Sequence, residues 1–335
     1  MSFEKTKVNL SRRNLLQSSS TLLLGAGLAG CSVGQSAAMA SNREDASRGS
    51  SSTKSLPFDD PEWNRDAFAR LQGDLDFGKQ KFGWYSGTVN AVVPNKKVQP
   101  LFGFEGFSFA RLVDEGNGVY QKLLREVGFY TDLKTGDVLE EWHNPFIDEK
   151  VRVVPIANDP FNFKITPYIL AGPSYGGLND NKVAKLPFRL PWREAGNDTV
   201  TMRSGIHLYY PSALDPEKWP RESSGKMNRV SEMFSYVIDR AQLADASQTG
   251  ITYSGAWGRI TPWLPWMLMG QSDGHCYYDC MMGAYDDMSV LSPKVRAYAE
   301  ENFPSYFEAP TVWTEPSYSS LENYAREQTP QPPKK

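Results

Sequence analysis

The chain of 335 residues is poor in the side chains that build metal centres, with three histidines and three cysteines. It has no P-loop and no HExxH motif, and its one GxGxxG match, residues 25–30, lies in an export-like segment. These absences disfavour nicotinamide, flavin and ATP chemistry, so we expect no organic cofactor and no metal. The net charge is -3 and no basic run occurs, which argues against nucleic acid or an anionic membrane surface as a partner.

Cys276 and Cys280 are the cysteines that stay in the folded body after export processing. On a strand, positions four apart lie on one face at about 13 Å, too far for a disulfide, so a bulge, turn or helix would be needed. A disulfide and two packed thiols both stay open. His275, with His143 and His207, offers further metal-ligand types, but a second cysteine pair is missing, which disfavours zinc.

Long hydrophobic runs are also missing, and the apolar stretch 21–30 is too short for a permanent membrane anchor. The preceding segment Ser11–Leu16 (SRRNLL) resembles a twin-arginine export signal. Two processing sites compete. Leu28–Cys31 resembles a lipobox that would lipidate Cys31, whereas Ala38–Ala40 fits cleavage before residue 41.

We therefore expect residues 1–40 to be recognised by the twin-arginine export machinery. The mature protein would be periplasmic or an outer-membrane lipoprotein, touching the membrane only through a lipid on Cys31. The polar segment 41–56 predicts a disordered tether, residues 57–312 a single β-rich domain, and residues 313–335 a C-terminal extension.

Aromatic and β-branched residues, which are abundant, recur in strand-like runs. Residues 119–160 predict three consecutive antiparallel strands joined by turns at 132–136 and 144–149. The middle strand has mixed polarity on both faces, which fits either a partly polar barrel interior or an edge strand. The pattern predicts an antiparallel up-and-down, calycin-like barrel of about eight to ten strands with a few short peripheral helices. A β-sandwich is the alternative.

Two helices have clear start signals. Asp60-Pro61 predicts a helix over Pro61–Gln72, with Trp63, Ala67 and Leu71 on one face, and Ser292-Pro293 starts another. Residues 172–176 match the GxSxG motif around Ser174. A nucleophile elbow needs a helix after the serine, and the following residues predict none, so a glycine-rich turn is favoured.

Several segments together resemble the bacterial DUF1838 family, over roughly residues 57–310. The most specific are Glu141–Pro145 (EWHNP) and Thr261–Gly270 (TPWLPWMLMG), supported by Glu105-Gly106, the turn Asp132–Gly136 and Asn158–Pro160. The function of that family is unassigned, so the resemblance implies no catalytic residues.

Charged residues on predicted strands are the candidates for chemistry, since Glu, Asp and Arg are rarely buried without a partner. We take Glu105, His207 and Glu232 as candidate acid–base groups. The candidate ligand-binding residues are Arg111, Trp142, His143, Tyr209, Trp257, Trp263 and Trp266. For each one alone, a solvated face, an internal ion pair or core packing is the competing interpretation.

The sequence thus predicts an exported protein that binds a bulky hydrophobic or aromatic small molecule in a barrel pocket. The alternative is an enzyme without an organic cofactor, a lyase, isomerase or hydrolase acting on such a molecule by general acid–base catalysis. A structural envelope lipoprotein with a filled interior is a third interpretation.

Overall fold

The computed structural model describes residues 55–171, 184–196 and 198–333. Its strands are β1 (Gln80–Val92), β2 (Gln99–Gly116), β3 (Val119–Thr131), β4 (Glu141–Asn144), β5 (Glu149–Arg152), β6 (Ile156–Asn158), β7 (Phe163–Ile165), β8 (Tyr168–Ala171), β9 (Ala184–Pro187), β10 (Trp192–Ala195), β11 (Thr199–Pro211), β12 (Met227–Asp239), β13 (Tyr253–Thr261) and β14 (His275–Tyr285). Its helices are α2 (Pro61–Gln72), α3 (Arg240–Ala244), η3 (Pro265–Met267), α4 (Pro293–Asn302), η4 (Pro304–Phe307) and α5 (Ser320–Glu327).

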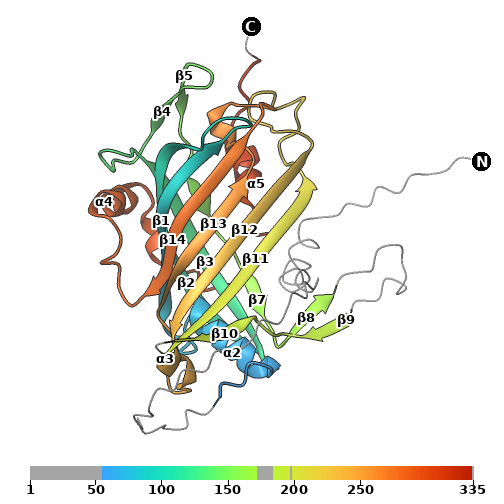
Figure 1. The fold of residues 1–335 in the computed structure, drawn as a ribbon, viewed down its shortest axis with the longest axis vertical. Helices are drawn as coiled ribbons and strands as arrows, with labels where there is room; N and C mark the ends of the chain where they lie inside the picture. Colours follow the sequence, from blue (N-terminus) through green and yellow to red (C-terminus); the bar gives the residue numbers. More distant parts are fainter. Residues whose placement is uncertain (1–54, 172–183, 197, 334–335) are drawn as a thin grey trace, which may run out of the picture.

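One large antiparallel sheet dominates this described part, so the expectation of a mainly β, antiparallel fold is confirmed. Its strand order is β10-β11-β12-β13-β14-β1-β2-β3, and β6 and β7 both pair with β3. Figure 1 shows the long strands side by side and steeply tilted. Within the described residues the hydrogen-bonded path does not close, because it ends at β10 on one side and at β6 and β7 on the other.

The first and last long strands meet in the middle of this sheet. β14 pairs with β1 from Phe82↔Tyr285 to Val92↔His275, and its other edge pairs with β13. The sheet is therefore held together by contacts between residues about 200 positions apart in the chain.

Two hydrophobic clusters fill the concave face of the sheet. One surrounds Phe104 and Tyr278 toward η3, and the other surrounds Met202 and Tyr236 toward α2. Tyr85 and Trp257 pack against both clusters, so the two form one continuous interior.

The convex face carries a third cluster. Phe107, Phe109 and Phe129 pack there beneath α4 and η4 through residues such as Val295 and Phe307. Figure 1 shows α4 against this outer side of the sheet. Both faces of β2 and β3 are therefore apolar, one toward the interior and one toward α4.

α2 begins and ends where the sequence predicts, with Asp60 as its N-cap accepting hydrogen bonds from the backbone N–H groups of Glu62 and Trp63. The fully buried Asn64 attaches the helix to the loop before β10. Its Oδ1 accepts from Leu190 N at 2.8 Å and from Trp192 Nε1 at 2.7 Å. The predicted helix after Ser292 is also observed, as α4.

The expected three-stranded run over residues 119–160 is only partly observed. β3 joins the main sheet as predicted, but β4 pairs with β5 in a separate two-stranded hairpin. That hairpin projects from the upper end of the molecule in Figure 1. Glu141 and His143 are exposed on it, so the mixed pattern of this segment reflects a strand outside the main sheet.

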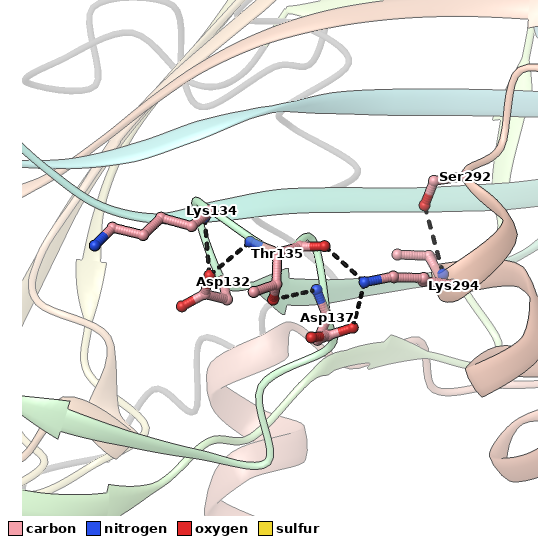
Figure 2. A network of polar contacts seen from close by, with 7 residues as sticks. Asp132, Lys134, Thr135, Asp137, Ser292 and Lys294 are labelled. Atoms are coloured by element: carbon pink, nitrogen blue, oxygen red, sulfur yellow. Dashed lines mark hydrogen bonds and ion pairs between the residues drawn. The ribbon is translucent and has the colours of Figure 1, made fainter.

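The predicted turn at 132–136 is present and is attached to α4 (Figure 2). The Asp132 carboxylate accepts hydrogen bonds from Lys134 N and Thr135 N, both at 2.8 Å. Lys294 Nζ, on α4, donates to Thr135 O at 2.7 Å and to Asp137 Oδ1 at 2.6 Å. The Asp132–Gly136 segment thus has a structural role, fixing the start of α4 over the convex face.

The two most specific family-like segments contact each other. Asn144 is fully buried, and its Nδ2 donates to Met267 O at 2.6 Å in η3. The rings of Trp142 and Trp266 lie 6.0 Å apart. The EWHNP hairpin therefore anchors the PWLPWM segment, which breaks regular structure because of its prolines.

No helix in the described part of the chain is long and apolar enough to span a membrane. The export segment, Cys31 and the GxSxG serine, Ser174, lie outside the described residues.

Candidate functional site

The concave face carries a layer of aromatic side chains from five strands. The Tyr85 ring lies 5.7 Å from Phe104 and 5.6 Å from Trp257, and Tyr278 lies 5.1 Å from Phe104 and 5.5 Å from Trp257. Tyr130, on β3, lies 5.3 Å from Phe104. These contacts connect the η3 end of the interior with the α2 end.

Glycines make room for this layer. Gly106 and Gly128 are directly opposite each other on β2 and β3. A Cβ at Gly106 would lie 2.3 Å from the Tyr85 ring, so only glycine fits beneath it. The Tyr85 hydroxyl donates to Val127 O at 3.2 Å, which fixes the ring across β3.

Two tyrosine hydroxyls meet inside the sheet. Tyr130 Oη and Tyr278 Oη lie 3.0 Å apart and form a buried hydrogen bond. Burial raises the pKa of Tyr130 to about 12, and burial raises the pKa of Tyr278 well above its ordinary value. Both hydroxyls therefore stay protonated at neutral pH and can each act as a hydrogen-bond donor or acceptor.

A half-buried arginine lies beside this pair. Arg259 is two residues after Trp257 on β13, so both side chains lie on the same face of the strand. The guanidinium carbon of Arg259 lies 5.8 Å from the centre of the Tyr278 ring. Arg259 Nε is 3.5 Å from Glu232 Oε1 on β12. Burial acts to lower the pKa of Arg259, but the Glu232 carboxylate and neighbouring tyrosines raise it, so the guanidinium is charged.

Arg259 and Glu232 nevertheless keep 20% and 23% of their side-chain area exposed. Arg259 is one of the residues that line a cavity, described below. Within the described residues, the buried Asn228 Nδ2 has no hydrogen-bond partner, and the buried Arg259 Nε makes only the 3.5 Å ion pair with Glu232. A buried donor without a good acceptor is costly, so both groups favour contact with an additional acceptor.

A second carboxylate lies on the same inner face. Glu126 Oε1, on β3, accepts a hydrogen bond from Asn158 Nδ2 at 2.6 Å. Burial raises the pKa of Glu126, and the nearby Glu232 carboxylate raises it further, while Asn158 and Lys122 oppose the change. Of these two carboxyl groups, Glu232 is paired with Arg259 and Glu126 is not. Different surroundings of two nearby carboxyl groups can give one the role of an acid and the other the role of a base.

Lys122, four residues before Glu126 on the same face of β3, is buried as well. Its Nζ donates to Gln72 Oε1 at 2.8 Å, and burial lowers the pKa of its amine to about 8. Lys122 thus contributes part of the positive charge near Glu126 from the α2 side.

A cavity of about 70 Å³ opens beside Tyr130, Tyr278 and Arg259. α5 covers it with Asn323 and Tyr324. Other residues along its wall are Asn228, Thr261, Trp263, Trp266 and Glu222.

α5 is attached over this cavity through a short relay. Asn323 Nδ2 donates to Ala157 O at 3.1 Å and to Asn158 Oδ1 at 3.3 Å. Because Asn158 also donates to Glu126, the helix over the cavity is linked through one side chain to the inner carboxylate.

The predicted site residues are divided between different places. Glu232, Trp257, Trp263 and Trp266 belong to the concave face or to the segment that closes it. Trp263 and Trp266 are almost fully buried, and both line the cavity.

Glu105 lies on the convex face, where it links strands to α4. Its Oε1 accepts from Trp84 Nε1 at 2.9 Å and from Ser292 N at 3.1 Å, and its Oε2 accepts from Ser292 Oγ at 2.5 Å. These bonds give Glu105 a structural role at the N-cap of α4.

The other predicted residues lie away from the interior. Arg111 donates to Gly78 O at 3.0 Å, and His207 is exposed, as is Tyr209 at 69%. His143 pairs at 3.2 Å with Asp148 on the exposed hairpin. The structure therefore does not bring Glu105, His207 and Glu232 together.

Trp142 packs from the β4–β5 hairpin onto Phe102 at 5.3 Å. Cys276 and Cys280 are both free and buried, and they share the inner face of β14 as strand geometry requires. Burial raises the pKa of each thiol to about 12, so both behave as packed apolar groups. Among the described residues, no three His, Cys, Asp or Glu side chains gather in a metal-binding group.

Sequence reasoning missed Arg259, Glu126, Tyr130 and Tyr278. Side chains alternate between the two faces of a strand, so residues two or four apart share a face. This rule places Arg259 on the same face as Trp257 and Glu126 on the same face as Tyr130. For Glu126 and Tyr130 the signal was hidden because β3 is apolar on both faces.

No curated protein matches this chain. The family model for a protein of unknown function (DUF1838) matches residues 78–328, which contain the whole cavity wall and the main sheet from β1 to β14. The match confirms the resemblance carried by the EWHNP and TPWLPWMLMG segments, and the chain belongs to the DUF1838 family.

Proposed function

We propose that the protein binds a hydrophobic or aromatic small molecule on the concave face of its main sheet, at the end covered by α5. The observation that carries this proposal is Arg259, a charged group that lines a cavity and whose Nε makes only a long, 3.5 Å ion pair with Glu232. Ligand sites typically combine an apolar, aromatic wall with a few oriented polar groups, as found around Tyr278 and Trp266.

We further propose that the sheet curls into a calycin-like barrel around this site. Support comes from Tyr85 and Trp257, which join the two inner clusters into one interior. In the described part, α4 and η4 cover the convex face by packing over Phe107, and the other two sheets have two strands each. A sandwich would need a second large sheet against one face.

The size of the cavity bears on how a ligand enters. About 70 Å³ holds a few water molecules, whereas pockets for drug-sized ligands enclose roughly 300–1,000 Å³. A bulky ligand therefore requires α5 to move away from Asn158 and Ala157. The few polar bonds of Asn323 make this displacement inexpensive compared with opening the sheet.

An enzyme acting by general acid–base catalysis is the second candidate, favoured by Glu126. Burial raises the pKa of this carboxyl group, and the Glu232 carboxylate beside Arg259 raises it further. A carboxyl group with a raised pKa and a second carboxyl group near it in one interior would suit a lyase, isomerase or hydrolase without an organic cofactor.

Native mass spectrometry of the protein purified from its own cells tests the binding proposal. We expect an organic molecule to co-purify, and Trp266→Ala to weaken its retention, while Trp313→Ala, a half-buried tryptophan outside the cavity wall, does not. A bare polypeptide, together with no thermal stabilisation by any of a panel of aromatic and aliphatic compounds, would contradict the proposal.

Glu126→Gln separates the two candidates once a ligand is known. A binding protein should keep affinity within a few-fold and convert nothing. An enzyme should lose turnover by about 100-fold or more while affinity stays. Glu105→Gln is the control, because its bonds lie on the convex face and should leave either activity unchanged.

We also propose, from the sequence alone, that the protein is exported by the twin-arginine route and is periplasmic or an outer-membrane lipoprotein. The intact mass of the mature chain tests this. Cleavage before Cys31 with an added diacylglycerol supports the lipoprotein, cleavage before Ser41 supports a free periplasmic protein, and a chain that keeps Met1 opposes both.

A further inference from the structure

We propose that the ligand is an organic monocarboxylate with an apolar or aromatic body, held through its carboxylate by Arg259. This inference rests on the proposed binding function and names the chemical class of its ligand.

The guanidinium is placed for such a contact. Arginine presents five N–H donors in a planar fork that matches a carboxylate, and its one ion pair here runs from Nε to Glu232 at 3.5 Å. That distance is long for a charge-assisted hydrogen bond, which is usually 2.7–2.9 Å. The wall of the cavity includes Arg259, so an entering carboxylate can reach the fork.

Neighbouring groups favour an acceptor as well. Asn228 lines the same cavity, and its buried Nδ2 donor has no partner among the described residues. The hydroxyls of Tyr130 and Tyr278 stay protonated and lie on the same wall. Because the two hydroxyls share one hydrogen bond, one of them keeps a free O–H, and an oxygen-bearing head group would accept from it and from Asn228 Nδ2. A purely apolar ligand would leave Asn228 Nδ2 unpaired at a cost.

The same wall limits the ligand to one negative charge. Glu222 lines the cavity, with Oε1 accepting from Gln331 N at 2.6 Å, and the exposed Glu327 lies at the α5 edge. With Glu232 already beside Arg259, a second carboxylate on the ligand would meet acidic side chains rather than another donor. The apolar body would instead pack against Trp266, Trp263 and Leu264.

Four probes with a common phenyl body test the head group by calorimetry at pH 7: hydrocinnamate, hydrocinnamide, phenylpropylamine and phenylsuccinate. We expect hydrocinnamate to bind at least about 10-fold more tightly than the other three, the ratio that one charge-assisted contact gives. An amide or amine that binds as tightly as the acid overturns the inference and leaves the binding function intact. Absence of binding by all four overturns both.

Two variants assign the preference to Arg259. Arg259→Lys keeps the positive charge and loses the planar fork, so the preference for hydrocinnamate over hydrocinnamide should fall several-fold. Arg203→Lys is the matched control, an exposed arginine on β11, and should preserve the wild-type ratio. An unchanged ratio in Arg259→Lys overturns the assignment, and the wild-type probe series decides the ligand class even where this variant fails to fold.

Discussion

Individual polar residues in this protein are divided between two faces of one sheet, and this division decides their roles. Glu105 and Glu126 lie on neighbouring strands, yet Glu105 faces α4 and Glu126 faces the interior. A sequence pattern assigns both to strands but cannot tell which face is inside when phenylalanines occupy both, as Phe104 and Phe107 do on β2.

Glu105→Ala should lower the free energy of unfolding by about 2–3 kcal/mol, because it leaves the Trp84 and Ser292 donors without their buried acceptor. Urea unfolding measures this change. Glu141→Ala is the control, since it removes an exposed ion pair with Lys150 and should cost less than about 1 kcal/mol. Equal losses in the two variants would contradict the structural role of Glu105.

Lys122 should make stability depend on pH in the alkaline range. Burial lowers the pKa of its amine to about 8 in the folded protein, whereas an unfolded chain has the ordinary 10.5. Between these values the unfolded state holds the proton that the folded state has lost, so raising the pH stabilises the folded state. The wild type should gain up to about 3 kcal/mol relative to Lys122→Met from pH 8 to 10.5.

The difference in unfolding free energy between the wild type and Lys122→Met isolates the contribution of Lys122. The raised pKa values of Tyr130 and Tyr236 also make stability depend on pH, but they act equally on both proteins. Urea unfolding at several pH values measures it. A difference that stays constant across the range would show that Lys122 is not the group responsible.

At the scale of elements, α5 is the part whose displacement ligand entry requires. Asn323→Ala removes both of its side-chain hydrogen bonds, to Ala157 and Asn158. Amide hydrogens of α5 should then exchange about fivefold faster, as the loss of about 1 kcal/mol implies. Hydrogen exchange with mass spectrometry gives the rates, and those of β1 and β14 should stay unchanged.

Glu327→Gln is the matched control on the same helix, because Glu327 is exposed. Its α5 exchange rates should equal those of the wild type. If α5 of Asn323→Ala exchanges at the wild-type rate, packing of Tyr324 against Trp219 holds the helix, and the hydrogen bonds of Asn323 to Ala157 and Asn158 do not.

Elements with strong local signals were predictable. Pro61–Gln72 forms the expected helix because its N-cap, first-turn proline and apolar spacing all lie within twelve residues. The strands Thr199–Pro211 and His275–Tyr285 follow from their β-branched and aromatic content. The β4–β5 segment was assigned to the wrong sheet, since strand pairing is not a local property.

At the scale of the whole molecule, β14 joins the two halves of the sheet. It pairs with β1 on one edge and β13 on the other, so a chain ending after Gly270 leaves both edges open. This truncated protein should lose the cooperative unfolding transition, as followed by tryptophan fluorescence in urea. A chain ending after residue 328 keeps all strands and should unfold cooperatively, and a native-like transition in the shorter chain would contradict the central role of β14.

The sequence by itself determined the β-rich class, the positions of α2, α4 and most long strands, and membership of the family, because these depend on local pattern and on short motifs. Only the tertiary structure decided that Arg259, Glu126, Tyr130 and Tyr278 meet inside the sheet while Glu105 and His207 do not. Alternation along a strand fixes which residues share a face, but which face becomes the interior depends on what packs against it, and α4 covers the other face from about 190 residues further along the chain.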